Sequence, residues 1–172
     1  MRQFTKEVNR VLSEIDTAKL DKKFLSSREF SSLAVQSYRA ASEADSDLKI
    51  QTLANALCNC VIPPISKDNN KATVLRTISH LSDTEIYVLS YFFRNTIQEK
   101  RLKLNADKIA LELSWPKQNV VVACEGLIQL GVARLPPVSW DDMPSGSEGD
   151  SYSITELGIQ TATYAMRSCQ IT

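Results

Sequence analysis

The chain has 172 residues, 43% of them hydrophobic, and its formal net charge at pH 7 is zero. This length and composition suit one ordinary globular domain or two small ones, and they argue against intrinsic disorder. No apolar run approaches the roughly 18 residues that a membrane-spanning helix needs. The charged start MRQFTKEVNR lacks the apolar centre of a signal peptide. We therefore expect a cytoplasmic protein.

Four cysteines and one histidine limit the metal and disulfide chemistry of the chain. Cys58, Cys60, Cys124 and Cys169 do not make a disulfide framework in a chain of this size, because such frameworks are dense in small secreted domains. Cys58 and Cys60 lie two positions apart, which places them on opposite faces of a helix, and only His80 could join them as a histidine ligand. We expect reduced structural thiols, no metal site and no cofactor.

Amphipathic helix patterns fill the first part of the chain. Residues 4–15 repeat apolar side chains at steps of three and four, which is one face of a helix. A second helix is predicted from Ser26, whose spacing to Glu29 matches a capping box. Asp45 or Ser46 can cap a third helix. These patterns predict an all-helical subdomain.

The double proline at positions 63 and 64 stops the third helix, because proline cannot donate a backbone hydrogen bond. The polar residues that follow are rich in turn formers. We predict a helical subdomain at residues 1–62, a linker at 63–72 and a second domain at 73–172. An exposed linker should be cleaved early by a protease, near Lys67 or Lys71, before any cut within residues 83–97.

The second domain opens with two helices. A short one is predicted at residues 74–81, and Ser82 and Glu85 then form a capping box before a longer one. Residues 101–104 alternate as a short strand does, and Asn105 can cap a compact helix.

A tight turn and a third helix follow in this domain. Residues 114–116 are the turn, with Pro116 suited to the first position of the next helix, which Gly131 closes. Strands at residues 132–135 and 152–154 flank a long hairpin loop. Thr155 then caps the last helix.

This element order resembles the winged helix-turn-helix superfamily as it occurs in bacterial regulators, over residues 81–166. Two segments support this resemblance most specifically. Residues 126–132 are a helix ending that leads into a strand, and residues 152–158 are a strand that leads into the last helix. The resemblance implies a mainly α fold in which the helical subdomain is followed by a winged-helix domain with a small β-hairpin wing. Residues 50–57 and 74–82 also resemble the helical segment that precedes the winged helix in abortive-infection alpha-type phage-defence proteins.

Superfamily analogy implies DNA binding through the helix that follows the turn. Lys117, Gln118 and Asn119 begin this helix, but the rest of it offers no cation, and its valines include Val122. Residues 136–172 hold one basic and five acidic side chains, although DNA-binding wings usually present Lys or Arg to phosphates. Four of these carboxylates are predicted on the wing: Asp141, Asp142, Glu148 and Asp150.

A protein-binding patch is the other interpretation of this face. An outward valine beside Trp140 and Met143 on the wing has the composition of an interface, where aromatic residues and methionine are enriched. The candidate binding surface therefore comprises six residues: Lys117, Gln118, Asn119, Val122, Trp140 and Met143.

Catalytic patterns are missing from the sequence. It contains no G-x-S-x-G, no phosphate-cradling glycine loop and no H-E-x-x-H, and we expect His80 to be a half-buried structural residue. We predict a non-enzymatic regulatory or scaffold module that acts by binding a protein partner or by self-association. The alternative is a DNA-binding transcriptional regulator that uses Lys117, Gln118 and Asn119.

Overall fold

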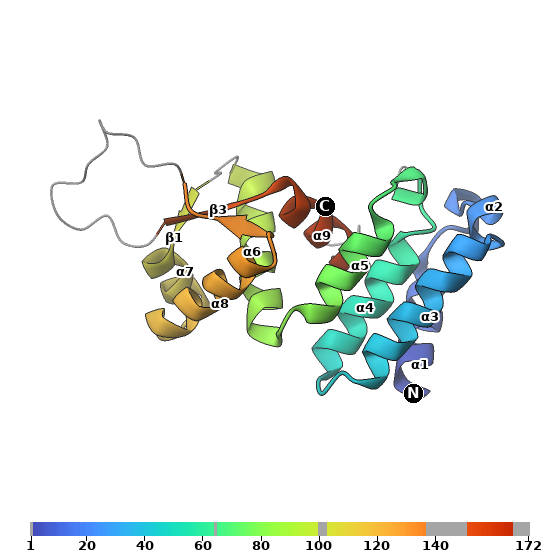
Figure 1. The fold of residues 1–172 in the computed structure, drawn as a ribbon, viewed down its shortest axis with the longest axis horizontal. Helices are drawn as coiled ribbons and strands as arrows, with labels where there is room; N and C mark the ends of the chain where they lie inside the picture. Colours follow the sequence, from blue (N-terminus) through green and yellow to red (C-terminus); the bar gives the residue numbers. More distant parts are fainter. Residues whose placement is uncertain (1, 64, 100–102, 137–150, 167–172) are drawn as a thin grey trace, which may run out of the picture. The chain divides into compact units, whose positions relative to one another are not determined.

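The computed structural model describes residues 2–63, 65–99, 103–136 and 151–166. Over these residues the chain is mainly helical with a small three-stranded antiparallel sheet, which confirms the predicted fold class at that level (Figure 1). Within these ranges, no helix is both long and apolar enough to cross a membrane. The chain divides into two compact units. Unit 1 holds the residues up to His80 and those from Thr163 onward, and unit 2 is Leu81–Ala162.

Among the described residues, unit 1 contains five α-helices and the end of a sixth, with a short 3-10 helix (Thr17–Lys19) between α1 and α2. The five are α1 (Arg2–Glu14), α2 (Lys22–Leu25), α3 (Arg28–Ser42), α4 (Asp47–Asn59) and α5 (Lys71–His80). Helix α4 packs against α1, α3 and α5, and α3, α4 and α5 lie side by side (Figure 1). The core between them is apolar: Leu33, Leu53, Leu57, Val74 and Ile78 are all buried. The helix predicted at residues 4–15 is confirmed as α1.

The helix starts in unit 1 are fixed by side-chain caps. Ser46 accepts a hydrogen bond from the Lys49 N–H at 3.1 Å, as predicted for the third helix. The prediction of Ser26 as the second cap is wrong. Ser27 is the N-cap of α3 and accepts from the Phe30 N–H, whereas the Ser26 hydroxyl donates back into α2. Sequence spacing favoured Ser26 because the short helix α2 was not anticipated.

The stretch predicted as a linker is folded into unit 1 where it is described. It forms a 3-10 turn (Ile65–Lys67) and then begins α5, which packs on α3 and α4. The unit boundary falls between His80 and Leu81, later than the boundary expected from the prolines. Of the two predicted cleavage sites, Lys67 is exposed, whereas Lys71 is only 3% exposed and is not accessible as expected. His80, expected to be half-buried, is exposed.

Unit 2 combines helices with the sheet. Its elements are α6 (Asp83–Glu99), β1 (Lys103–Asn105), α7 (Ala106–Leu113), α8 (Lys117–Gln129), β2 (Ala133–Arg134), β3 (Ser151–Ile154) and the greater part of α9 (Glu156–Ala165). The strand order is β1-β3-β2, with Leu104 opposite Tyr152 and Ala133 opposite Ile154. Helices α6, α7 and α8 enclose the core of this unit. Each contributes an almost completely buried side chain: Phe92, Ile109 and Leu127. The strands flanking the predicted hairpin do pair, while the loop at residues 137–150 lies outside the described residues.

Several residues predicted to cap or end the helices of unit 2 are confirmed in these roles. The Asn105 side chain accepts from the Asp107 N–H, and the Thr155 hydroxyl accepts from the Gly158 N–H. Gly131 ends α8 with a φ of 71°, a left-handed conformation that glycine adopts without steric cost. The Val132 N–H then donates back to the Leu127 carbonyl, which closes the helix end.

Candidate binding surface

The start of α8 is positioned by the turn that precedes it. Ser114 takes a left-handed conformation, with φ 54° and ψ 40°, and ends α7. The Trp115 N–H donates to the Ala110 carbonyl at 2.9 Å, which holds the turn against α7. Pro116 is the N-cap of α8 instead of its predicted first residue, because its ψ of 134° is extended. The turn leaves the first residues of α8 exposed: Lys117, Gln118 and Asn119.

The charge of Lys117 is paired. Its Nζ lies 3.0 Å from both carboxylate oxygens of Asp107 on α7. The two side chains remain 44% and 58% exposed, so the pair adds little to stability. It does place a carboxylate beside the cation that opens the candidate recognition helix. The sequence could not show this pairing, since the two residues come from different helices.

Val122 is the exposed apolar residue of α8. It is 57% exposed and lines a hollow of about 270 Å³ together with Asn119 and Ala123 of α8. The other wall comes from the start of α6: Ser82, Thr84 and Glu85. Two of the six predicted surface residues, Asn119 and Val122, are therefore brought together here. The charged residue that lines this hollow is Glu85, a carboxylate.

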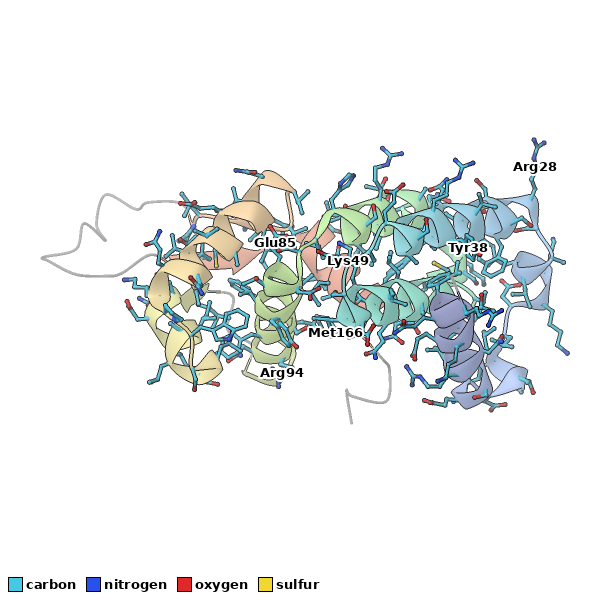
Figure 2. All side chains as sticks on the ribbon, turned by 90° about the horizontal axis from the view of Figure 1, so that it is seen from below. Arg28, Tyr38, Lys49, Glu85, Arg94 and Met166 are labelled. Atoms are coloured by element: carbon cyan, nitrogen blue, oxygen red, sulfur yellow. The ribbon has the colours of Figure 1, made fainter. Side chains whose placement is uncertain are left out.

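Glu85 is held at the edge of this hollow by the predicted capping box. Its Oε2 accepts from the Ser82 N–H at 2.6 Å, and the Ser82 hydroxyl accepts from the Glu85 N–H at 3.3 Å. The other carboxylate oxygen, Oε1, occupies the place that a Cβ at position 126 would take, so Gly126 makes room for it on α8 (Glu85 is labelled in Figure 2). The sequence pattern indicates Gly126 only as part of the helix ending, because its role depends on the packing of α6 on α8.

Two further apolar side chains of unit 2 are exposed near the turn. Tyr87 on α6 is 48% exposed and packs edge-on against Trp115, with ring centroids 5.7 Å apart. Leu111 on α7 is 80% exposed and lies one helical turn after Asp107, on the same face. Sequence reasoning missed both. The signal for Leu111 was present, because it falls off the apolar face formed by Ile109 and Ala110.

The remaining two predicted surface residues, Trp140 and Met143, lie outside the described residues, as do the four acidic residues predicted on the wing. The described part of the candidate surface therefore consists of α8's first half, the start of α6 and the exposed face of α7.

A second candidate site is a cluster of three side chains of reactive types in unit 1: Lys71, Cys60 and Tyr164. The buried ammonium group of Lys71 donates to the backbone carbonyls of Ser66 and Asp68, lies 3.1 Å from a Glu29 carboxylate oxygen and sits 4.8 Å above the centre of the Phe24 ring. All of its donor capacity is directed into the fold. Lys71 thus ties the start of α5 to the turn before it and to α3.

The other members of this cluster are held in their neutral forms. Burial raises the pKa of the Cys60 thiol to about 12, even though the charge of Lys71 acts in the opposite direction. Burial, together with a 2.7 Å hydrogen bond from its hydroxyl to Asp68, also raises the pKa of Tyr164. A thiol at this pKa is a poor nucleophile at neutral pH. The three side chains of the cluster therefore have a structural role, since the contacts of Lys71 and Tyr164 join α3, α5 and α9 to the turn before α5.

Cys58 and Cys124 are likewise buried thiols that are not joined in a disulfide. Among the described residues, no group of three or more potential metal ligands comes together. Cys169 lies outside those residues.

Comparison of the chain with protein-family models, with curated proteins and with solved structures finds no match in any of the three. The two resemblances stated from the sequence therefore remain predictions.

Proposed function

We propose that this chain is a non-enzymatic regulatory or scaffold module of the winged-helix type, and that unit 2 binds a protein partner. The contact surface would be the exposed face of α8 with the neighbouring parts of α6 and α7. The observation that carries the proposal is the pairing of Lys117 with Asp107 beside an exposed Val122.

The charges of this face favour a protein over DNA. Nonspecific affinity for DNA comes largely from cations that neutralise phosphates. Here the cation that opens α8 has a carboxylate at 3.0 Å, and the charged residue lining the hollow is Glu85. Exposed aliphatic and aromatic side chains such as Val122, Leu111 and Tyr87 are what a protein interface buries.

The winged-helix assignment is supported by the order of elements in unit 2. A helix, a short strand, two helices joined by a tight turn and two paired strands follow one another from α6 to β3. In this arrangement α8 occupies the position of the recognition helix. An exposed valine on such a helix is consistent with a domain that has exchanged base contacts for apolar ones.

Site-directed photo-crosslinking in cells can test the partner. A photoreactive phenylalanine analogue in place of Val122 should yield one discrete protein adduct, because a specific interface buries this side chain. The matched control places the same analogue at Glu156, an exposed residue in the first turn of α9. We expect no adduct there. Equal labelling at both positions would contradict the proposed surface.

The DNA-binding alternative gives the opposite result in a purified system. We expect random duplex DNA to show no binding below ~100 μM at ~0.15 M salt by fluorescence anisotropy, the weak end of the usual nonspecific range. Micromolar binding that is lost in Lys117→Ala and strengthened in Asp107→Asn would overturn the protein-partner proposal in favour of a DNA-binding regulator.

A further inference from the structure

A groove in unit 1 between α3 and α5 carries two arginines with no carboxylate partner among the described residues. It has a volume of about 320 Å³ and is lined by Gln36, Ser37, Arg39 and Ala40 of α3 and by Leu75, Arg76 and Ser79 of α5. Arg39 and Arg76 are both exposed, one from each helix. All residues that line the groove belong to unit 1. The groove is therefore separate from the surface proposed above, which lies on unit 2.

Ser37 of α3 lies beneath this groove with its hydroxyl buried. The residue is 2% exposed, and its hydroxyl makes no hydrogen bond within the described structure. A buried hydroxyl without a partner costs stability, so its presence calls for an explanation. The hydroxyl oxygen has almost no accessible surface, so a ligand in the groove would not contact it unless the side chain turned outward. The exposed guanidinium groups of Arg39 and Arg76 are therefore the donors that a ligand would meet.

The acidic groups of unit 1 that have described partners are engaged elsewhere. Glu7 and Glu14 pair with Arg10, Glu29 pairs with Lys71, and Asp21 accepts from the Phe24 N–H and the Ser66 hydroxyl. These hydrogen bonds lower the pKa of Asp21, which keeps it ionised where it is. Glu43 is one turn after Arg39, and no ion pair joins them. The two guanidinium groups are left to bind an anion from solution.

We propose that this groove binds a phosphate monoester of a small organic molecule. Two guanidinium groups supply several N–H donors in the planar arrangement that suits phosphate oxygens. Leu75 and Ala40 add an apolar wall for the organic part. A nucleic acid polymer fits less well, because the other lining residues are uncharged and a polymer needs a row of cations.

Nuclear magnetic resonance titration of the full chain can test the proposal, with adenosine 5′-monophosphate and inorganic phosphate as probes at constant ionic strength. We expect saturable shifts of the Arg39 and Arg76 side-chain signals with millimolar affinity, stronger for the monoester than for inorganic phosphate. Arg39→Gln and Arg76→Gln should each weaken binding about tenfold, as loss of a charged hydrogen bond does. Both residues are exposed, so these variants should fold normally.

The matched control is Arg28→Gln, at the start of the same helix, where Figure 2 shows the side chain pointing away from the helices. It should bind the probes as the parent does. Shifts that never saturate, or an equal loss of affinity in the control, would mean general charge screening and would overturn the proposal. Tighter binding of a short oligonucleotide than of the monoester would also overturn it. None of these outcomes depends on the surface of unit 2.

Discussion

Lys71 illustrates how a basic residue from a polar stretch becomes part of a core. Its ammonium group donates to two backbone carbonyls and sits 4.8 Å above the centre of the Phe24 ring. Most of the benefit comes from satisfying those carbonyls, because Glu29 is 56% exposed and an ion pair to it is weak.

Replacing Lys71 by methionine tests this account, since methionine keeps the stem and removes the donors. We expect Lys71→Met to lower the free energy of unfolding by about 2 kcal/mol, because the Ser66 and Asp68 carbonyls lose their partner. Urea denaturation followed by circular dichroism measures the change. Lys67→Met, at an exposed position in the preceding turn, should stay within about 0.5 kcal/mol of the parent. Equal stability of both variants would show that the ammonium group contributes nothing.

At the scale of elements, two helical glycines each leave space that a neighbouring group fills, but the neighbours differ in how easily they can move. A Cβ at Gly126 would meet the end of the flexible Glu85 side chain, whereas a Cβ at Gly158 would meet the Val132 backbone carbonyl and, at 2.6 Å, Cγ1 of Ile154. The first neighbour can move and the second cannot. Gly158 therefore lets the first turn of α9 approach the end of α8, where the Thr155 hydroxyl also bonds to the Gly131 carbonyl.

Alanine at each glycine should separate these two cases. Gly158→Ala should destabilise the protein by about 2 to 3 kcal/mol, the cost of overpacking against backbone. Gly126→Ala should be nearly neutral, because the gain in helix propensity of about 1 kcal/mol offsets the loss of the Glu85 cap. In a Glu85→Ala background, Gly126→Ala should become stabilising by about 1 kcal/mol. Thermal unfolding measures all four variants, and equal effects at both glycines would refute the distinction.

At the scale of the whole molecule, the end of α9 is held by the first half of the chain. The Asn59 side-chain amide on α4 donates to the Tyr164 carbonyl at 2.8 Å and to the Met166 carbonyl at 3.1 Å. Asn55, one turn earlier, donates to the Ala165 carbonyl at 3.3 Å. These are carbonyls that the last turn of a helix leaves without internal partners. Unit 1 is therefore assembled from two distant parts of the sequence.

Removing the Asn59 amide should release this chain end. We expect Asn59→Ala to lower the free energy of unfolding by about 1 to 3 kcal/mol, since two carbonyls lose their donor. Hydrogen exchange by mass spectrometry should show faster exchange for the last turn of α9 and little change in α8. Asn9→Ala, at an exposed position on α1, is the control. Unchanged exchange at the end of α9 would mean that Asn55 and the hydrogen bond from Tyr164 to Asp68 hold this segment without Asn59.

The sequence by itself determined the local structure where short-range chemistry suffices. The caps at Ser46, Ser82, Asn105 and Thr155 and the helix end at Gly131 each depend on residues a few positions apart, so their spacing was visible in the chain. Apolar periodicity likewise predicted α1 and the mainly helical fold class. The misplaced cap at Ser26 marks the limit of this reasoning, because neighbouring serines offer alternatives that only the packed helix distinguishes.

Only the tertiary structure decided the features that join distant residues. Lys71 and Asn59 look like ordinary surface residues in the sequence, and burial against segments far along the chain gives them their roles. The same holds for the candidate surface: exposure of Lys117, Gln118 and Asn119 followed from their place in the turn, but the pairing of Lys117 with Asp107 came from packing α7 on α8. Periodicity predicts which face of a helix is apolar. It does not specify which other element covers that face, and that choice determines which charges are neutralised and which hydroxyl, such as that of Ser37, is left unpaired.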